Sequence, residues 1–314
     1  MKLLATLLLA LAFGQAARQP GEYPLGPDSL PQPGVPQGRL EGPFLFKSPA
    51  AIPNTVRRYW IYVPAQYTGA PAANLLVLQD GQGAIGPTGA LRVPQVLDNL
   101  IHKKEVPVTI GVFITPGHRG DVFPEPGTGN PNNRAAEYDS LTDAYTRMLM
   151  DELLPEIGKI YKITTDPAGR AIGGASSGAI CAFTVAWHRP DAFRNVLSLI
   201  GSYTSIAWRP ARDGQPMVSG GEVYPTLIRK SPIKPIKIFL QDGSNDLNNE
   251  HGSWFLANQQ MLSALEFANS RANTQNAPGP RYQVNHVWGD GAHSNAHGGA
   301  ILPDMLRWIW NDAK

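Results

Sequence analysis

The chain has 314 residues, of which 42% are apolar, and its 27 basic residues nearly balance 25 acidic ones. This apolar content can build a full core, which excludes a largely disordered chain, and the length suits a single α/β domain. The near-neutral charge creates no field that attracts a polyanion, so nucleic acid is not an expected partner and small or amphipathic ligands are favoured.

The N-terminus has the three parts of a secretory signal peptide. Lys2 precedes an apolar run from Leu3 to Phe13, and the small residues of GQAA follow it. The run is too short to span a bilayer. We therefore expect residues 1–17 to be a signal peptide cleaved near Ala16 or Ala17. The protein would then be exported, periplasmic or secreted, with no stable membrane insertion after cleavage.

The next segment, residues 18–43, is rich in Pro and Gly and is predicted to be an extended arm or linker. No composition break divides residues 44–314, which we expect to form one catalytic domain. The sole cysteine, Cys181, excludes an intrachain disulfide and is interpreted as a small buried hydrophobe.

Apolar runs typical of buried strands alternate with segments of helical period from about residue 57 onward. This alternation predicts a single α/β domain with a mostly parallel central sheet and helices on both faces. The expected strands are 57–64, 74–79, 107–114, 195–201, 236–241 and 281–288, and the expected helices are 142–160, a segment around Cys181, 253–268 and 299–312.

One turn carries a recognisable nucleophile pattern. Residues Gly174 to Gly178, GASSG, fit G-x-S-x-G, in which a sharp strand-to-helix turn exposes the hydroxyl of the central serine, here Ser176. The glycines suit the close approach of the chain to itself. Because this short pattern also arises by chance, it needs support from elsewhere in the chain.

That support comes from two later turns, each just past an expected strand. Asp242 and Asp246 follow the strand 236–241, and His293 and His297 follow the strand 281–288. The order Ser, Asp, His is that of the α/β-hydrolases and excludes the chymotrypsin and subtilisin orders. A histidine can take the serine proton, and a carboxylate fixes the histidine tautomer and stabilises its charged form.

An oxyanion would also need donors. The backbone N–H of Ser177 is one candidate, and that of Gln82, in the turn after strand 74–79, is the other. A plain glycine turn is the alternative interpretation of Asp80 to Gly83.

With these residues in view, the chain resembles the esterase D and enterochelin-esterase-like branch of the α/β-hydrolases, which includes feruloyl and acetyl-xylan esterases and mycolyltransferases. The resemblance runs from about Arg57 to Trp310. It implies a compact, mostly lidless hydrolase with Ser176 as nucleophile, Asp246 as acid, His293 as base and Gln82 as second oxyanion donor. The motifs that carry it are YVP, LQDGQ, NNRAAEYDSLTDAYTRMLMDELLP, GGASSGA, HRPDAFRNVLSLIGS, FLQDGSND and GAHSNAHGGAILPDMLRWIW.

Alternatives remain at each position. Asp242 competes with Asp246, and His297 competes with His293. A metal site formed by Asp290, His293 and His297 is weakly indicated, since the H-E-x-x-H pattern is missing. Two further groups have less specific interpretations: Arg134, Glu137 and Tyr138 as a structural ion pair near the site, and Trp254, Tyr203 and Trp208 as pocket lining or surface packing.

The sequence thus predicts an exported serine hydrolase of carboxylic esters that works through an acyl-enzyme and needs no cofactor or metal. Acyl esters of sugars or aromatic acids, including polysaccharide-linked ones, and siderophore esters are the expected substrates. An acyltransferase with the same triad, and a non-catalytic binding protein on this fold, are the alternatives. The sequence sets no oligomeric state.

Overall fold

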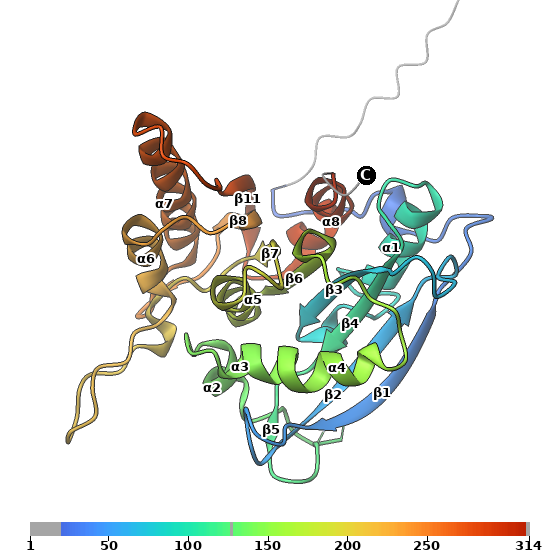
Figure 1. Cartoon of the computed structure of the whole chain (residues 1–314), viewed down its shortest axis with the longest axis horizontal. Helices are drawn as coiled ribbons and strands as arrows, with labels where there is room; N and C mark the ends of the chain where they lie inside the picture. The colour runs from blue at the N-terminus through green and yellow to red at the C-terminus, as the bar shows by residue number, and fades with distance from the viewer. Residues whose placement is uncertain (1–19, 126–127, 312–314) are drawn as a thin grey trace, which may run out of the picture.

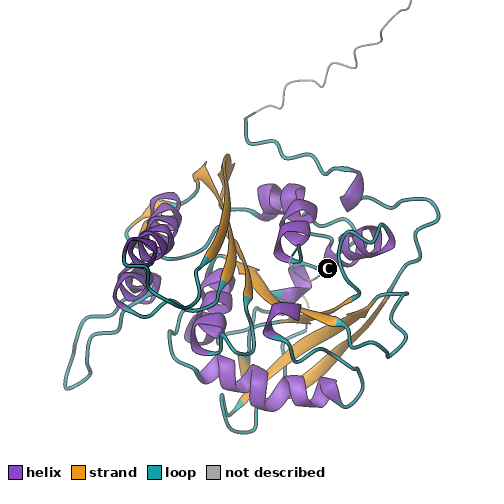
Figure 2. Cartoon of the chain, turned by 45° about the horizontal axis from the view of Figure 1, so that its top comes forward, coloured by secondary structure: helices purple, strands orange, loops and turns teal. Residues whose placement is uncertain are grey.

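The computed structural model describes residues 20–125 and 128–311, and the predicted signal peptide therefore lies outside the described residues. A central sheet carries helices on both sides (Figures 1 and 2). Within the described ranges, no helix is both long and apolar enough to cross a membrane.

The main sheet has the strand order β1-β2-β4-β3-β6-β7-β8-β11, and the short β5 pairs with β2. The pairs made by β2 are antiparallel, whereas every neighbouring pair from β4 to β11 is parallel. The predicted α/β class with a mostly parallel sheet is confirmed. The strands are β1 (Arg39–Lys47), β2 (Thr55–Val63), β3 (Asn74–Gln79), β4 (Thr109–Ile114), β5 (His118–Arg119), β6 (Arg170–Ala175), β7 (Asn195–Leu199), β8 (Lys237–Asn245) and β11 (Gln283–Ala292), with β9 (Asn248–Asn249) and β10 (Gly252–Ser253) forming a separate hairpin.

The helices form two layers because successive side chains of a strand point to opposite faces of the sheet. In β3, Leu75 and Val77 join one apolar cluster with η3, α4, α5, α6 and α7, whereas Leu76 and Leu78 join another with α1 and α8. The helices are α1 (Val93–His102), α2 (Arg134–Tyr138), α3 (Ala144–Arg147), η3 (Met148–Leu153), α4 (Leu154–Gly158), α5 (Ser177–His188), α6 (Tyr224–Lys230), α7 (Trp254–Thr274) and α8 (Asn295–Ile309), with single 3₁₀ turns at η1 (Pro27–Ser29), η2 (Gly81–Gly83), η4 (Pro167–Gly169), η5 (Ser205–Ala207) and η6 (Gly221–Val223).

The expected helix 142–160 corresponds to three consecutive segments. A π-helical stretch, η3, joins α3 to α4, and Pro155 lies in the first turn of α4. The buried side chains of all three segments still lie on the sheet side, in the same apolar cluster as β3. The predicted helical periodicity is therefore confirmed, but the sequence did not predict the π-helical stretch between α3 and α4.

The predicted boundary between arm and domain, at residues 43 and 44, falls inside a strand. β1 begins at Arg39 and pairs with β2, and its register shifts between Glu41 and Phe44. Most of its residues are exposed, so no apolar alternation marks it in the sequence. Gly42 and Pro43, which suggested a linker, occupy the irregular part of this edge strand.

The segment before β1 is fastened to the helix layer formed by α1 and α8. Asn99 donates to the backbone oxygens of Asp28 and Leu30, at 2.8 and 2.9 Å. The Asp28 carboxylate forms ion pairs with Lys103, the residue after α1, and with Arg307 of α8. These contacts hold residues 20–38 on the surface of the domain, where Figure 1 shows them beside both helices.

Candidate active site

Ser176 lies at the sharp turn between β6 and α5, with φ of 59° and ψ of −124°. Such backbone geometry is costly for a residue with a side chain and clusters at functional sites. Gly174 permits the turn, because a Cβ at that position would lie 2.7 Å from the carbonyl carbon of Gly178. The G-x-S-x-G pattern therefore corresponds to a strained turn that presents the Ser176 hydroxyl at the carboxyl edge of the sheet.

The structure brings His293 and Asp246 to this serine. His293 follows β11, and its Nε2 lies 2.9 Å from the Oγ of Ser176. Its Nδ1 lies 2.6 Å from Oδ1 of Asp246, whose side chain is fully buried just after β8. Because an ionised carboxylate only accepts hydrogen bonds, Nδ1 carries the proton and Nε2 of the neutral ring accepts from Ser176.

Burial alone would raise the pKa of Asp246, but hydrogen bonds from His293 and Asp242 outweigh it and lower that pKa below its ordinary value. Asp246 is therefore ionised at neutral pH. A buried single negative charge beside Nδ1 stabilises the protonated form of the imidazole.

The competing residues Asp242 and His297 have other partners. Asp242 is fully buried and accepts hydrogen bonds from the backbone N–H of Gly243 at 2.7 Å and the amide of Asn258 at 2.6 Å. Burial, followed by the proximity of Asp246, raises the pKa of Asp242 to about 9. His297 lies in the first turn of α8, with its Nδ1 2.9 Å from the amide nitrogen of Gln241.

Ser202 completes a hydrogen-bond chain that the sequence did not reveal. Its Oγ lies 2.9 Å from that of Ser176 and accepts the indole N–H of Trp254 at 2.8 Å. Since Ser176 donates to His293, Ser202 must donate to Ser176. The available signal was its place just after β7, at the same edge of the sheet as the other site residues.

The two candidate oxyanion donors lie in turns that follow the paired strands β3 and β6. Asp80 and Gly83 of the first turn and Ala175, the last residue of β6, border one small cavity. Among the hydrogen bonds of the described chain, neither the Gln82 nor the Ser177 N–H takes part in one. Gly81 permits the turn at Gln82, because a Cβ there would lie 2.4 Å from the backbone nitrogen of Ile114.

A cleft of about 910 Å³ opens beside Ser177. Part of its wall comes from a hairpin, closed by bridges between Arg209 and Val218 and between Arg212 and Gln215, that extends from the body of the domain (Figure 1). Apolar and cationic side chains share the lining. The residues are Arg134, Ala135, Ala136, Asp139, Ser140, Leu141, Thr142, Ser177, Ile206, Ala207, Arg209, Met217, Val218 and Ser219.

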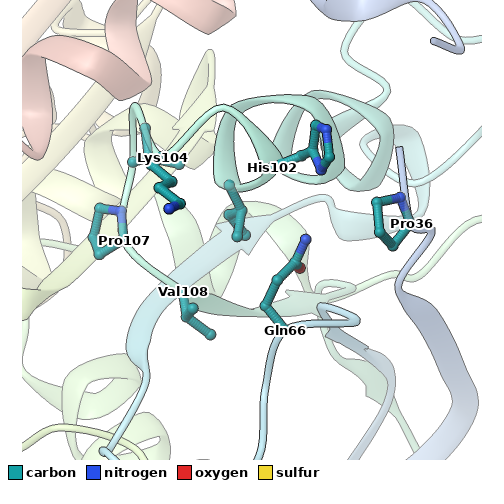
Figure 3. Close-up of a pocket in the computed structure, with 8 residues that line it drawn as sticks. Pro36, Gln66, His102, Lys104, Pro107 and Val108 are labelled. Carbon is teal, nitrogen blue, oxygen red and sulfur yellow. The ribbon is translucent and has the colours of Figure 1, made fainter. Parts of the chain in front are cut away.

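A second cavity, of about 650 Å³, lies near the amino end of β4, at the end of the parallel strands opposite to Ser176 (Figure 3). Its lining includes Val108, just before β4, and His102 and Lys104 at the end of α1. Because β4 and β6 run in the same direction, the start of β4 and the end of β6 are at opposite edges. This cavity therefore does not communicate with Ser176.

The residues expected to form an ion pair near the site are paired with other parts of the chain. Arg134 binds the carboxylate of Asp80 in the turn after β3, at 2.8 to 3.2 Å. Glu137 forms a fully buried pair with Arg57 of β2. The hydroxyl of Tyr138 accepts the N–H of Asp80 at 3.3 Å. Arg134 and Tyr138 thus both support the turn that carries Gln82.

The aromatic residues considered as pocket lining differ in position. Trp254 is buried, with its ring edge-on to His293 at a centroid distance of 5.8 Å, and Tyr203 is buried against Ser198. Trp208 is 45% exposed, at the base of the hairpin. Cys181 is buried, as expected.

The three residues of the weak metal pattern are not gathered around one point. His297 stacks on Tyr23 at a centroid distance of 4.1 Å, and the Asp290 carboxylate accepts the hydroxyl of Tyr23 at 2.5 Å. His293 faces Ser176 and Asp246. Within the part of the chain that the structure describes, no group of three or more His, Cys, Asp or Glu side chains is arranged to hold a metal ion.

Comparison with known proteins places this site in a family. Residues 50–309 match the family model Esterase, described as "Putative esterase". The chain belongs to this family. It is a family of carboxylic ester hydrolases with the α/β-hydrolase architecture.

Individual relatives agree with this assignment. Iron(III) enterobactin esterase of Escherichia coli (strain K12) is 30% identical over 159 residues, which are 51% of this chain and 34% of that protein. The enterobactin esterase of Shigella flexneri, solved in the presence of enterobactin, is 23% identical with a TM-score of 0.66, over 97% of this chain and 65% of that one. The CE1 ferulic acid esterase of Anaeromyces mucronatus, in complex with ferulic acid, is 16% identical with a TM-score of 0.59, over 91% and 96%.

The two solved structures show the fold. The chain spans about a third of the E. coli relative and about two thirds of the Shigella one.

Proposed function

We propose that the chain hydrolyses carboxylic esters through a Ser176–His293–Asp246 triad and an acyl-enzyme. The observation that carries this proposal is the continuous hydrogen-bond chain from Ser176 Oγ to His293 Nε2, at 2.9 Å, and from His293 Nδ1 to Asp246, at 2.6 Å. Membership of the Esterase family supports it.

In the first half-reaction, Nε2 of His293 takes the proton of Ser176 as Oγ bonds to the ester carbonyl carbon. The N–H groups of Gln82 and Ser177 stabilise the resulting oxyanion. Collapse of the tetrahedral intermediate breaks the bond to the alcohol oxygen, which receives its proton from His293. Water then attacks the acyl-enzyme with His293 again acting as base, and the acid leaves as Ser176 regains its proton.

We further propose aromatic acyl esters as the substrate class, whether the alcohol is a sugar or part of a siderophore. Enterobactin and ferulic acid are named with the solved relatives. The cleft beside Ser177 offers apolar contacts from Leu141, Ile206, Met217 and Val218. Such a lining suits an aromatic ring better than an acetyl group.

Hydrolysis of methyl ferulate and p-nitrophenyl acetate by the wild type and by Ser176→Ala tests both statements. We expect the variant to lose about a thousandfold or more of kcat/KM, the scale of a triad deletion. A higher kcat/KM for methyl ferulate than for methyl acetate, which has the same leaving group, supports the aromatic class. A variant as active as the wild type contradicts the triad. Assays with an added acceptor sugar, followed by product analysis, separate hydrolysis from acyl transfer.

Export is proposed on the pattern of residues 1–17 alone. Expression of the full chain in a bacterium, followed by cell fractionation and N-terminal sequencing, tests it. An exported protein that begins after Ala16 or Ala17 supports the proposal. An unprocessed protein in the cytoplasm contradicts it.

A further inference from the structure

We propose that Asp242 is a neutral carboxylic acid whose proton is donated to Asp246, which makes it a positioning residue for the triad. The inference rests on the proposed function, because it concerns how the acid member of that triad is held. It assigns a role to the carboxyl group that the sequence offered only as a competitor of Asp246.

A side-chain hydrogen bond between the two carboxyl groups contributes to the raised pKa of Asp242 and to the lowered pKa of Asp246. Oδ1 of Asp246 accepts Nδ1–H of His293 and the backbone N–H of Leu247, at 2.6 and 2.5 Å. Oδ2 of Asp246 is buried and has no N–H donor or hydroxyl within the described chain. Carboxylates only accept hydrogen bonds, so a contact between two carboxyl oxygens requires a proton between them. Asp242 is the group able to supply that proton to Oδ2.

The surroundings of Asp242 favour its neutral form. Its side chain is fully buried, and the groups that face it are Asp246 from the end of its own strand, the Gly243 N–H and the Asn258 amide from α7. None of them is a cation. By contrast, Asp246 faces His293, which can become one. Burial and the charge of Asp246 accordingly raise the pKa of Asp242, while that of Asp246 is lowered.

Asn258 fixes the orientation of Asp242. Its amide nitrogen also lies 2.8 Å from the backbone oxygen of Gly201 and 3.0 Å from that of Trp254. The Asp242 carboxyl is thus held by α7 on one side and delivers its hydroxyl to Asp246 on the other. The pair carries one negative charge, which matches the one positive charge that His293 gains during catalysis.

The hydrogen bond from Asp242 lowers the basicity of Asp246. Without it, Oδ2 would be a buried acceptor without a donor, and the more basic Asp246 would bind the imidazolium more tightly. This change alters the protonation equilibrium of the His293–Asp246 unit. A packing role alone would change stability and not this equilibrium.

The test compares kcat/KM across pH for the wild type and for the variants Asp242→Asn, Asp242→Ala and Asp246→Asn, with Ser176→Ala as the reference for triad chemistry. An Asn at 242 keeps a donor for Asp246 and an acceptor for Asn258 but cannot also accept the Gly243 N–H, so we expect Asp242→Asn to lose no more than about tenfold, the scale of one neutral hydrogen bond. Asp242→Ala removes the donor to a charged group and should lose about 10- to 100-fold. Its acid limb should move to higher pH, since a more basic Asp246 holds the imidazolium more tightly. Asp246→Asn should lose about 10³- to 10⁴-fold.

Two results would overturn the inference. If Asp242→Asn is as inactive as Asp246→Asn, the charge of Asp242 is required. If Asp242→Ala keeps both the activity and the acid limb of the wild type, Asp242 positions nothing.

A spectroscopic measurement keeps the test valid even if Asp242→Ala does not fold. Infrared difference spectra at neutral pH between the wild type and Asp242→Asn should contain a protonated-carboxyl C=O band from the wild type alone. Absence of this band contradicts the neutral form. Failure of the triad proposal and failure of this inference can be told apart. An active Ser176→Ala enzyme refutes the triad. The infrared band, recorded in the Ser176→Ala background as well, decides separately whether Asp242 is protonated.

Discussion

The indole N–H of Trp254 donates to the hydroxyl of Ser202 at 2.8 Å, although 52 residues separate them in the chain. The direction of the next hydrogen bond is set from the other end of the chain of contacts. Because the single proton of Ser176 is donated to His293, the hydroxyl of Ser202, 2.9 Å away, is the group that donates to Ser176. The order of donors thus runs from Trp254 at the start of α7 through two serines to His293.

Ser202→Ala removes the donor to Ser176 Oγ, and we expect kcat/KM to fall by about 3- to 10-fold, the scale of one neutral hydrogen bond. Trp254→Phe keeps a ring beside His293 and should lower activity in the same direction. The double variant should be no worse than Ser202→Ala alone, since Trp254 acts through Ser202. Fully additive losses would show that Trp254 acts separately, and kinetics on one aryl ester suffice to decide.

The pH dependence of stability should differ between the wild type and Asp242→Asn. An Asp242 carboxyl titrates at its ordinary value of 3.8 in the unfolded chain, whereas burial and Asp246 raise its pKa to about 9 in the folded protein. Between these values the folded protein binds more protons than the unfolded chain, so its stability falls as the pH rises.

The Asn variant lacks this titration. Relative to the variant, the wild type should lose up to about 1.4 kcal/mol per pH unit across this range. Urea unfolding at several pH values between these limits measures the difference. Parallel curves for the two proteins would contradict a protonated Asp242.

Replacement of Glu137 by Gln should strongly destabilise the protein. Arg57 and Glu137 form an ion pair with side chains 0% and 1% exposed, and the carboxylate also accepts the N–H of Gly117 at 3.0 Å. An unpaired Arg57 in this position costs about 3–5 kcal/mol of unfolding free energy.

Glu125→Gln is the matched control. Its partner Arg58 is the next residue of β2, but Glu125 is 71% exposed, so the cost should be below about 1 kcal/mol. Urea unfolding of both variants measures the contrast. Equal losses would indicate that burial does not set the strength of these pairs.

Tyr23→Phe should lower both stability and activity. The Tyr23 hydroxyl donates to the carboxylate of Asp290 at 2.5 Å and accepts the N–H of the same residue at 2.9 Å. Asp290 lies in the segment that leads to His293. Loss of these bonds should cost about 1–2 kcal/mol and reduce kcat a few-fold.

Tyr67→Phe serves as the comparison for Tyr23. The Tyr67 hydroxyl accepts the N–H of Lys162 at 2.7 Å, near the amino ends of the parallel strands. This variant should lose stability and keep the wild-type kcat. An unchanged kcat in Tyr23→Phe as well would separate the N-terminal segment from the site.

The fold was largely predictable because its central strands are continuous apolar runs. The run 74–79 was placed to the residue as β3, since parallel strands are buried on both faces. β1 was missed for the opposite reason: it is an exposed edge strand with a register shift. The π-helical stretch 148–153 has no distinct sequence signal, because its side chains keep a helix-like pattern.

The candidate site was predictable as far as chain order and turn chemistry reach. Ser176, Asp246 and His293 lie in turns that follow β6, β8 and β11, and the carboxyl ends of these parallel strands share one edge. The roles of Ser202 and Asp242 depend on which side chains meet in three dimensions. No spacing rule links Ser202 to Trp254, or Asp242 to Asn258, so sequence patterns could not assign them.

Attachment of Tyr23 to Asp290 has a practical consequence for assays of this protein. The proposed cleavage near Ala16 or Ala17 would leave a chain that begins only a few residues before Tyr23. A purification tag or fusion partner joined at that end would be close to the loop that carries His293. The exact start of the expressed polypeptide therefore becomes an experimental variable of the rate measurements, and preparations that differ there should be compared before any rate is assigned to the native protein.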